Sequence, residues 1–220
     1  MAAGEAALRD LKRAARLVVK ERLEAMGKAR VDAESALISS YILESKTWKA
    51  AKSVFLYLSM PNEFQTSALL QDCVETRKKV HVPLMVGKHD MRAVHVNPAA
   101  IESFPMKKWG IREPEVPEEL QTADSVTWST STLAKSTPPP PIDLVIMPGV
   151  LFDRKGKRLG HGRGYYDKFL SSLKDQYSAA EIPFPTLMAP CLSVQVSHSP
   201  VPGDDSDWNV DMLVTPDGIM

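Results

Sequence analysis

Apolar and polar residues follow one another in blocks that favour helices separated by short strands. Residues 6–26 predict a helix whose apolar stripe, at helical spacing, consists of Leu8, Leu11, Ala15 and Val18. A second helix is predicted over residues 32–45, with Asp32 as its N-cap, and a third over Thr66–Arg77. Short apolar runs predict strands at Val54–Leu58, Val80–Met85, Met91–Val96, Ile142–Gly149 and, as the final strand, Met212–Thr215.

This alternation predicts the fold class. Helices between short apolar runs indicate an α/β protein, a Rossmann-like three-layer α/β/α sandwich with a mostly parallel central sheet. A chain of 220 residues can bury its core as one domain, so residues 1–220 are predicted to form a single domain. Ser, Thr, Glu and Pro dominate from Glu113 to Pro141, which predicts an irregular excursion at about residues 115–141 rather than a domain boundary.

One run of the chain is rich in glycine and in cations. Residues 153–167 read D-R-K-G-K-R-L-G-H-G-R-G-Y-Y-D, between the strand predicted at Ile142–Gly149 and a helix predicted over Tyr165–Leu173. Glycine lets backbone N–H groups approach a ligand closely, and the positive end of a following helix attracts oxyanions. The pattern favours a phosphate-binding loop, although a plain surface loop can also be rich in glycine.

Two carboxylates, Asp153 and Asp167, bracket this run. Magnesium needs only one or two such oxygens beside substrate phosphates, so the run suggests a nucleoside triphosphate bound with a metal. In parallel sheets, ligands collect outside the carboxyl ends of the strands. Leu58–Glu63 and Gly149–Gly164 each follow a strand, so both segments are expected at the same edge of the sheet.

Composition excludes several classes of protein. Lys plus Arg and Asp plus Glu each total 27, and this zero net charge argues against a nucleic-acid partner. Cys73 and Cys191 lack metal-type spacing and are expected to be reduced. No run of eighteen apolar residues and no signal peptide is visible, which predicts a cytoplasmic protein without a membrane partner.

Several motifs resemble one family. The run R-L-G-H-G-R-G-Y-Y-D, with P-G-V-L-F-D just upstream, resembles the signature of the 5-formyltetrahydrofolate cyclo-ligase family, also called 5,10-methenyltetrahydrofolate synthetases. Further segments resemble the family in the same order over nearly the whole chain: Lys12–Arg16, Leu58–Glu63, Trp109–Pro114 and Val210–Thr215. The resemblance implies a three-layer α/β fold and an enzyme that uses ATP and magnesium to close 5-formyltetrahydrofolate to 5,10-methenyltetrahydrofolate.

The resemblance also implies roles for individual residues. Arg158 and Tyr165 would be catalytic, and Asp167 and Asp211 would hold Mg²⁺, with Asp207 a weaker candidate. The implied ATP contacts are Lys12, Arg16, Arg158, Leu159, Gly160, His161, Gly162, Arg163, Gly164, Tyr165 and Tyr166. The implied folate contacts are Leu58, Glu63, Trp109, His161, Gly162, Arg163, Gly164 and Tyr165.

The residues alone leave some of these roles open. Lys12 and Arg16 are four apart, so they share one helix face, which either borders a cleft beside the apolar stripe or is simply solvated. Glu63 could bind a pterin N–H group or lie exposed. Trp109 could belong to the core or offer a flat surface to a pterin ring.

Two other features of the motif bear on the folate. A basic pair at His161 and Arg163 would suit the glutamate tail of a folate, which could be polyglutamylated. Leu151 stands where the family generally carries Gly or Ala, and its larger side chain is expected to narrow the mouth of the site.

The implied chemistry transfers the ATP γ-phosphoryl group to the formyl oxygen, after which N10 attacks and phosphate leaves. Such a reaction needs positioning and charge neutralisation more than a strong base. A dinucleotide-dependent oxidoreductase is disfavoured, because it would need G-x-G-x-x-G directly after its strand. The remaining alternative is a non-catalytic folate- or nucleotide-binding protein of the same fold. A monomer is expected.

Overall fold

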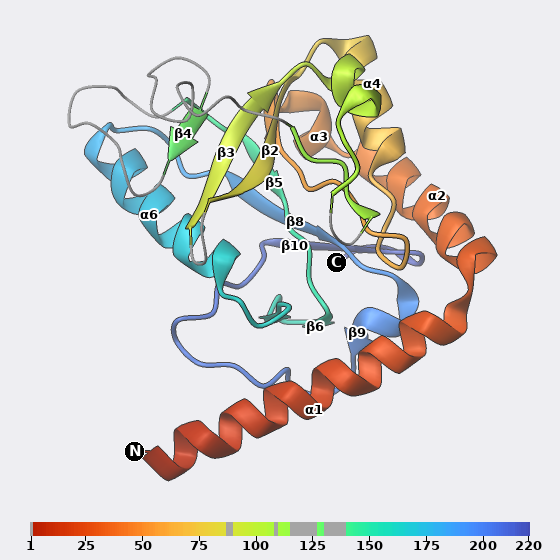
Figure 1. Cartoon of the computed structure of the whole chain (residues 1–220), viewed down its shortest axis with the longest axis vertical. Coiled ribbons are helices and arrows are strands. Elements are labelled where there is room, and N and C mark those ends of the chain that lie inside the picture. The colour runs from red at the N-terminus through yellow and green to blue at the C-terminus, as the bar shows by residue number, and fades with distance from the viewer. Residues whose placement is uncertain (1, 87–89, 108–109, 115–126, 130–139) are drawn as a thin grey trace.

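A computed structural model describes residues 2–86, 90–107, 110–114, 127–129 and 140–220. Its centre is an eight-stranded sheet in the order β11-β10-β8-β5-β1-β2-β3-β4 (Figure 1). The strands are β1 Ser53–Phe55, β2 Lys79–Val86, β3 Asp90–Val96, β4 Thr127–Ser129, β5 Leu144–Ile146, β8 Thr186–Pro190, β10 Met212–Thr215 and β11 Gly218–Ile219. Pairing is parallel from β2 through β1, β5 and β8 to β10, whereas β3, β4 and β11 pair antiparallel at the two edges.

Helices cover both faces of this sheet, so the predicted three-layer architecture is confirmed. The helices are α1 Ala2–Met26, α2 Lys28–Glu44, α3 Lys46–Ala50, α4 Ser67–Thr76 and α6 Tyr165–Ala179, with 3₁₀ turns η1 Pro98–Ser103 and η3 Ser193–Gln195. Helix α6 lies on one face and buries Phe169, Leu170, Leu173 and Tyr177, while α2, α3 and α4 lie on the other face (Figure 1). Each face thus has its own apolar core.

The second helix begins earlier than predicted. It starts at Lys28, directly after Gly27, whose φ of 70° lets the chain turn sharply out of α1. Asp32 is therefore not an N-cap, because it lies inside the helix and pairs with Lys28 one turn away.

Three strands of the central sheet, β4, β8 and β11, were missed. Prolines at positions 183, 185 and 190 argue against a strand, yet β8 lies in the middle of the sheet with Pro190 as its last residue. Met212–Thr215 was predicted to be the final strand, but β11 follows it. Trp109 and most of the excursion at 115–141 lie outside the described residues, although three of its residues form β4.

A small second sheet replaces part of the predicted loop. Its order is β7-β6-β9, formed by Arg158–Leu159, Leu151–Asp153 and Val196–Ser197. Asp153 is only 6% exposed, and its carboxylate accepts hydrogen bonds from the backbone N–H groups of Lys155, Lys157 and Val201. The expectation that Asp153 offers a metal-binding carboxylate was wrong, because these bonds commit it to the β6–β7 turn.

The inner face of α1 also differs from the predicted stripe. Leu11 and Val18 are 60% and 45% exposed, whereas Val19 and Met26 are buried and Ala15 and Leu23 pack against a buried cluster. The stripe is thus rotated, and Lys12 and Arg16 continue the inward-facing side of the helix toward its N-terminus. The alternative that this cationic face is simply solvated was wrong.

The buried imidazole of His81 on β2 gives the fold a pH dependence. Burial and the neighbouring His95 lower the pKa of His81 from 6.5 to about 4. The folded state therefore favours neutral His81, and its contribution to stability is present above pH 6.5 and lost as the pH falls toward 4. We expect protonation of this residue to lower the free energy of unfolding by on the order of 2 to 3 kcal/mol between pH 7 and pH 4. Urea unfolding at both pH values should show a smaller pH-dependent loss for His81→Gln than for the unaltered chain; equal losses would contradict this.

Candidate active site

The glycine loop runs from Gly160 to Gly164, between β7 and the first turn of α6. Gly162 and Gly164 have φ values of 93° and 69°, in the region that side chains with a Cβ rarely adopt. A Cβ on Gly162 would also lie 3.1 Å from Cζ of Arg16. The loop therefore needs glycine both for its backbone path and for its close contact with α1, and it leads into the N-terminus of a fifteen-residue helix.

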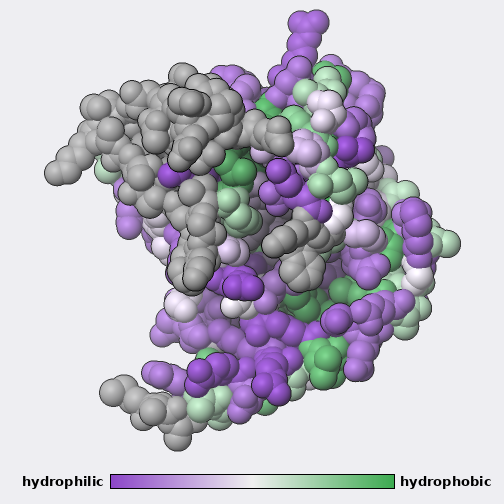
Figure 2. Space-filling model, in the orientation of Figure 1, coloured by the Kyte–Doolittle hydropathy of each residue, from purple (hydrophilic) through white to green (hydrophobic). Residues whose placement is uncertain are grey.

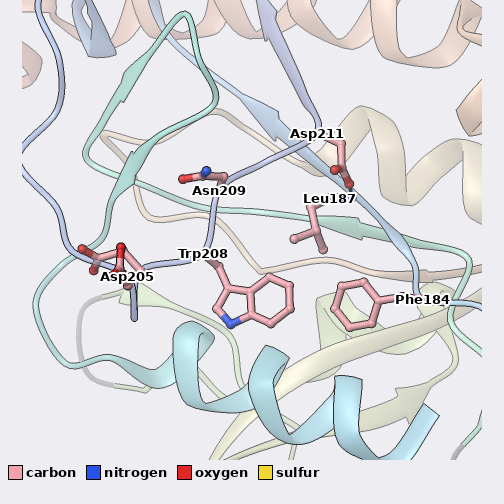
Figure 3. Close-up of a pocket in the computed structure, with 7 residues that line it drawn as sticks. Phe184, Leu187, Asp205, Trp208, Asn209 and Asp211 are labelled. Carbon is pink, nitrogen blue, oxygen red and sulfur yellow. Dashed lines mark hydrogen bonds between the residues drawn. The ribbon is translucent and has the colours of Figure 1, made fainter. Parts of the chain in front are cut away.

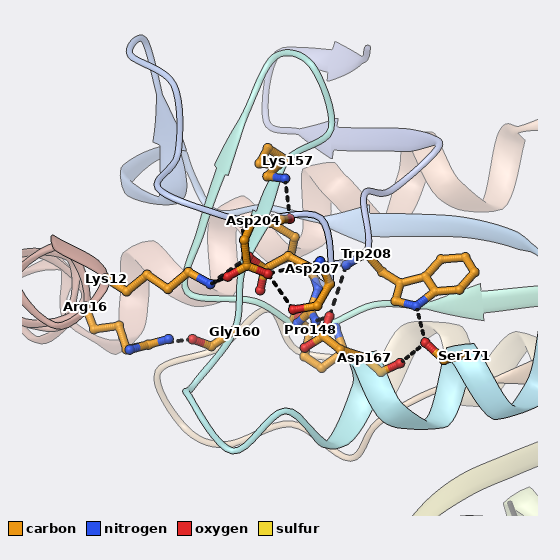
Figure 4. Close-up of polar contacts among 12 residues, drawn as sticks. Lys12, Arg16, Pro148, Lys157, Gly160, Asp167, Ser171, Asp204, Asp207 and Trp208 are labelled. Carbon is orange, nitrogen blue, oxygen red and sulfur yellow. Dashed lines mark hydrogen bonds and ion pairs between the residues drawn. The ribbon is translucent and has the colours of Figure 1, made fainter. Parts of the chain in front are cut away.

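Two cations of α1 reach this loop and its surroundings. Arg16 Nε donates to the carbonyl oxygen of Gly160 at 2.8 Å, and Lys12 Nζ lies 2.9 Å from Asp204 Oδ2 and 2.7 Å from Asp207 Oδ2 (Figure 4). Burial lowers the pKa of Lys12, but hydrogen bonds to Asp207 and Asp204 outweigh it, so the net pKa is raised. Figure 2 shows hydrophilic side chains gathered along α1 and above it.

Arg158 and Asp167 form an ion pair beneath the loop. Arg158 Nη2 lies 2.7 Å from Asp167 Oδ1, and the arginine side chain is only 4% exposed. The same Oδ1 atom accepts the backbone N–H of Trp208 at 3.1 Å (Figure 4), while Arg158 Nη1 donates to the Pro148 carbonyl oxygen. Asp167 Oδ2 has no hydrogen bond or ion pair to other described residues, so one oxygen of this carboxylate is left for a ligand.

Tyr166 packs between the sheet and this ion pair. Its ring centroid lies 6.1 Å from that of Phe55 and 5.9 Å from Cζ of Arg158. Burial and the charge of Glu63 raise its pKa, so the phenol stays neutral. The Tyr166 hydroxyl and Arg158 Nε are both buried and make no hydrogen bond within the described ranges. Tyr165 is half-buried against the same core.

The loop after β1 meets the glycine loop, as predicted from the shared sheet edge. Glu63 Oε1 lies 3.3 Å from His161 Nε2, and Glu63 Oε2 accepts the backbone N–H of Met60 at 2.9 Å. The Glu63 side chain is only 13% exposed, so the alternative of a fully solvated carboxylate was wrong. Segments that are almost a hundred residues apart thus form one site.

Asp211 lies in a different environment from Asp167. Its carboxylate accepts the backbone N–H of Leu187 at 2.7 Å and lines a pocket of about 370 Å³. Figure 3 shows it beside Leu187, with Trp208 and Phe184 stacked between it and α6. No described residue bonds to both Asp167 and Asp211. Asp207, in contrast, precedes Trp208, whose N–H contacts Asp167.

Three further predicted contact residues differ in their exposure. Leu58 is half-buried against the main core, and Arg163 is exposed on the glycine loop. Leu159 is 2% exposed and packs under α1, so its side chain faces away from the loop and its main chain alone is available to a ligand.

Sequence reasoning missed three residues that shape the site. Asp204 neutralises Lys12, and its pKa falls to about 2 through hydrogen bonds from Ser206 and Lys12. Trp208 follows the acidic loop, residues 204–207, and anchors it to α6. Its backbone N–H donates to Asp167, and its Nε1 donates to Ser171 (Figure 4). Gln195 Nε2 donates to the Gly149 carbonyl oxygen at 2.7 Å and fixes the turn after β5. The acidic run at 204–207 was the available signal.

Leu151 does not line the mouth of the site. It is 8% exposed and belongs to the cluster of Val19, Val150, Leu159 and Val201 under α1. The expectation that it narrows the site was wrong, because its position in β6 directs it toward the helix rather than toward the glycine loop.

Truncating Leu151 should therefore affect stability rather than ligand binding. We expect Leu151→Ala to cost about 2 to 5 kcal/mol of unfolding free energy, because it leaves a cavity beneath α1. At a temperature where the variant is folded, the KM for 5-formyltetrahydrofolate, the substrate that the resemblance implies, should stay within about twofold of normal, since the side chain faces away from the site. Urea unfolding and steady-state kinetics test this; a lower KM with unchanged stability would contradict it.

The fold and the site together define a three-layer α/β protein with a glycine loop, contacted by an arginine of α1, at the carboxyl edge of its sheet. A family model described as the 5-formyltetrahydrofolate cyclo-ligase family matches residues 8–216. The chain is 31% identical over 208 residues to a probable 5-formyltetrahydrofolate cyclo-ligase of Schizosaccharomyces pombe, covering 93% of this chain and 95% of that protein. The chain belongs to the 5-formyltetrahydrofolate cyclo-ligase family.

Other relatives agree with this assignment. The chain is 32% identical to a mitochondrial 5-formyltetrahydrofolate cyclo-ligase of Arabidopsis thaliana, covering 95% of this chain and 75% of that protein. The structure of a 5,10-methenyltetrahydrofolate synthetase from Aquifex aeolicus is similar with a TM-score of 0.68 and 25% identity, covering 95% of this chain and 91% of that one. Across the described residues, no helix has the length and apolar character needed to cross a membrane.

Proposed function

We propose that this chain catalyses the ATP- and magnesium-dependent cyclisation of 5-formyltetrahydrofolate to 5,10-methenyltetrahydrofolate, with release of ADP and phosphate. One observation supports this most strongly. The glycine loop is contacted from one side by Arg16 and from the other by Glu63, so a phosphate-type site and a carboxylate suited to a pterin share one loop. We propose a monomer in the cytoplasm as its working form.

The phosphate side of the proposed site lies between α1 and α6. Arg16 points at the glycine loop, and Lys12 points at the acidic loop. The backbone N–H groups at the start of α6 add a partial positive charge. In this structure, Arg16 donates to the carbonyl oxygen of Gly160, which is a weaker acceptor than a phosphate oxygen. We propose that both cations bind the triphosphate, with the loop residues supplying main-chain contacts.

The carboxylates fit a magnesium ion that arrives with the nucleotide. Within the described ranges, no three His, Cys, Asp or Glu side chains form a metal cluster, but magnesium needs only one or two carboxylates beside phosphates. We propose Asp167 as one ligand, through its uncommitted Oδ2 atom. Of the two candidates for a second ligand, Asp207 is favoured over Asp211 because it neighbours the Asp167 contact at Trp208. When bound, the metal would neutralise charge on the phosphates.

The folate side is proposed around Glu63, Leu58 and Tyr165. A carboxylate with little exposure is a strong acceptor for the amino and ring N–H groups of a pterin. Half-buried Leu58 and Tyr165 offer apolar surface beside it. Arg163 is exposed on the loop, where it suits the anionic glutamate tail.

We propose a reaction of two steps, phosphoryl transfer and ring closure. The formyl oxygen attacks the γ-phosphorus, the bond to the β–γ bridging oxygen breaks, and ADP leaves. N10 then attacks the activated formyl carbon and loses its proton, and the carbon–oxygen bond breaks to release phosphate. The chain's contribution is to hold the two substrates in line and to supply positive charge from Lys12, Arg16 and Arg158.

The stoichiometry of the reaction tests this proposal. Purified protein with magnesium, ATP and 5-formyltetrahydrofolate should release one ADP and one phosphate for each folate consumed, and no ADP without folate. The alternative is a non-catalytic folate- or nucleotide-binding protein of the same fold. Such a protein would bind both ligands in calorimetry but release no folate-dependent ADP.

A further inference from the structure

We propose that His161 is a positioning residue that holds the Glu63 carboxylate in the orientation that receives the folate. This inference rests on the proposed function and deepens it. It differs from the roles that the resemblance implies for His161, namely direct contacts with ATP and with the folate, whose glutamate tail a basic pair at His161 and Arg163 would suit.

The contacts of Glu63 divide between two loops. Oε2 accepts the Met60 backbone N–H at 2.9 Å, within the loop after β1, whereas Oε1 faces His161 Nε2 at 3.3 Å, across the site. A protonated Nε2 donates to that oxygen. Among the described residues, His161 is the one side chain that contacts the Glu63 carboxylate, so the carboxylate can rotate away from the glycine loop only by losing this partner.

The position of His161 is itself fixed from the opposite side. Arg16 Nε donates to the carbonyl oxygen of Gly160 at 2.8 Å, and the backbone of Gly162 packs against the same guanidinium group. The residues before and after His161 are thus held by α1. The imidazole projects from this anchored backbone toward Glu63, although its side chain is 54% exposed.

The buried surroundings of Glu63 strengthen its dependence on such a hydrogen-bond donor. Tyr57 and Tyr166 are buried close enough for the charge of Glu63 to raise their pKa values, in addition to the effect of burial. A carboxylate in this environment loses much of its hydration and depends on the few N–H groups aimed at it. With His161 in place, Glu63 presents its remaining lone pairs to a flat ligand that carries amino and ring N–H groups, as a pterin does.

A residue that acts through Glu63 predicts a particular kinetic pattern. His161→Ala should raise the KM for 5-formyltetrahydrofolate about fivefold to tenfold, while kcat and the KM for ATP stay within about twofold. His161→Gln, whose side-chain amide also donates from an Nε2 atom, should restore most of the lost affinity. His198→Ala, at another exposed histidine, is the matched control and should resemble the unaltered chain.

A double-mutant cycle separates this role from a direct contact with the folate. If His161 acts through Glu63, His161→Ala should have almost no further effect in a Glu63→Ala background, in which no side-chain acceptor is left for His161. Fully additive effects, or a folate KM that does not change in His161→Ala, would overturn the inference while leaving the proposed function intact. Absence of turnover in the unaltered chain would overturn both, and it is measured before any variant. Thermal unfolding of His161→Ala should match the unaltered chain; a large loss of stability would assign His161 a structural role instead.

Discussion

Asp167→Asn is expected to lower turnover by on the order of a hundredfold or more, since it removes the charge proposed to hold the metal at nearly constant shape. The structure adds a second expectation. Asp167 is the counter-charge of Arg158, whose side chain is only 4% exposed. Neutralising Asp167 therefore leaves the buried Arg158 cation without its partner. We expect a loss of roughly 3 kcal/mol in the free energy of unfolding, smaller if the Asn carbonyl oxygen keeps its hydrogen bonds.

Steady-state kinetics at saturating magnesium and urea unfolding of the same sample separate the two effects. Asp175→Asn is the matched control, because Asp175 lies exposed on the same helix. It should leave both turnover and stability unchanged. Normal turnover in folded Asp167→Asn would remove Asp167 from the site, whereas a stability loss alone would reduce it to the structural partner of Arg158.

Removal of either inward-facing cation of α1 should raise the KM for ATP about 10- to 100-fold, because each charge-assisted hydrogen bond to a phosphate is worth roughly 1.5 to 3 kcal/mol. The KM for the folate should change by less than about threefold in Lys12→Ala and Arg16→Ala. Lys12 has a further role, since its loss removes the cation that forms ion pairs with both Asp204 and Asp207. Lys12→Ala is therefore expected to be the more damaging of the two at low magnesium.

Arg13→Ala provides the control on the same helix. Arg13 is exposed and, unlike its neighbours, does not belong to the inward-facing side. Its substitution should leave both KM values unchanged. If all three variants behave alike, the contacts of Lys12 and Arg16 serve only to dock α1.

The order of helices and strands could be read from hydrophobic spacing, but the inner face of α1 could not. Periodicity counts apolar side chains, and here two inner positions carry Lys12 and Arg16, which are partly buried and pair with Asp207 and with the Gly160 carbonyl oxygen. The predicted stripe of Leu8, Leu11, Ala15 and Val18 is therefore rotated about the helix axis relative to the face that packs inward. Strand β8 was missed for a different reason, because two prolines precede it and a third ends it, a pattern typical of a loop.

The shared edge of the site could also be predicted, because parallel strands place their carboxyl ends together. The pairs that build the site could not. Glu63 meets His161, and Arg158 meets Asp167, only through tertiary packing. Asp153 shows the reverse case, since its place beside a glycine turn suggests a ligand while three backbone N–H groups already use its oxygens.

The formation of the methenyl product tests the proposed cyclo-ligase function most directly. The conjugated methenyl cation absorbs in the near ultraviolet, where 5-formyltetrahydrofolate does not. Purified protein should produce this absorbance only when 5-formyltetrahydrofolate, ATP and magnesium are all present, and Asp167→Asn should produce it far more slowly. Binding of both substrates without any rise in absorbance would contradict the proposed activity and favour the non-catalytic alternative.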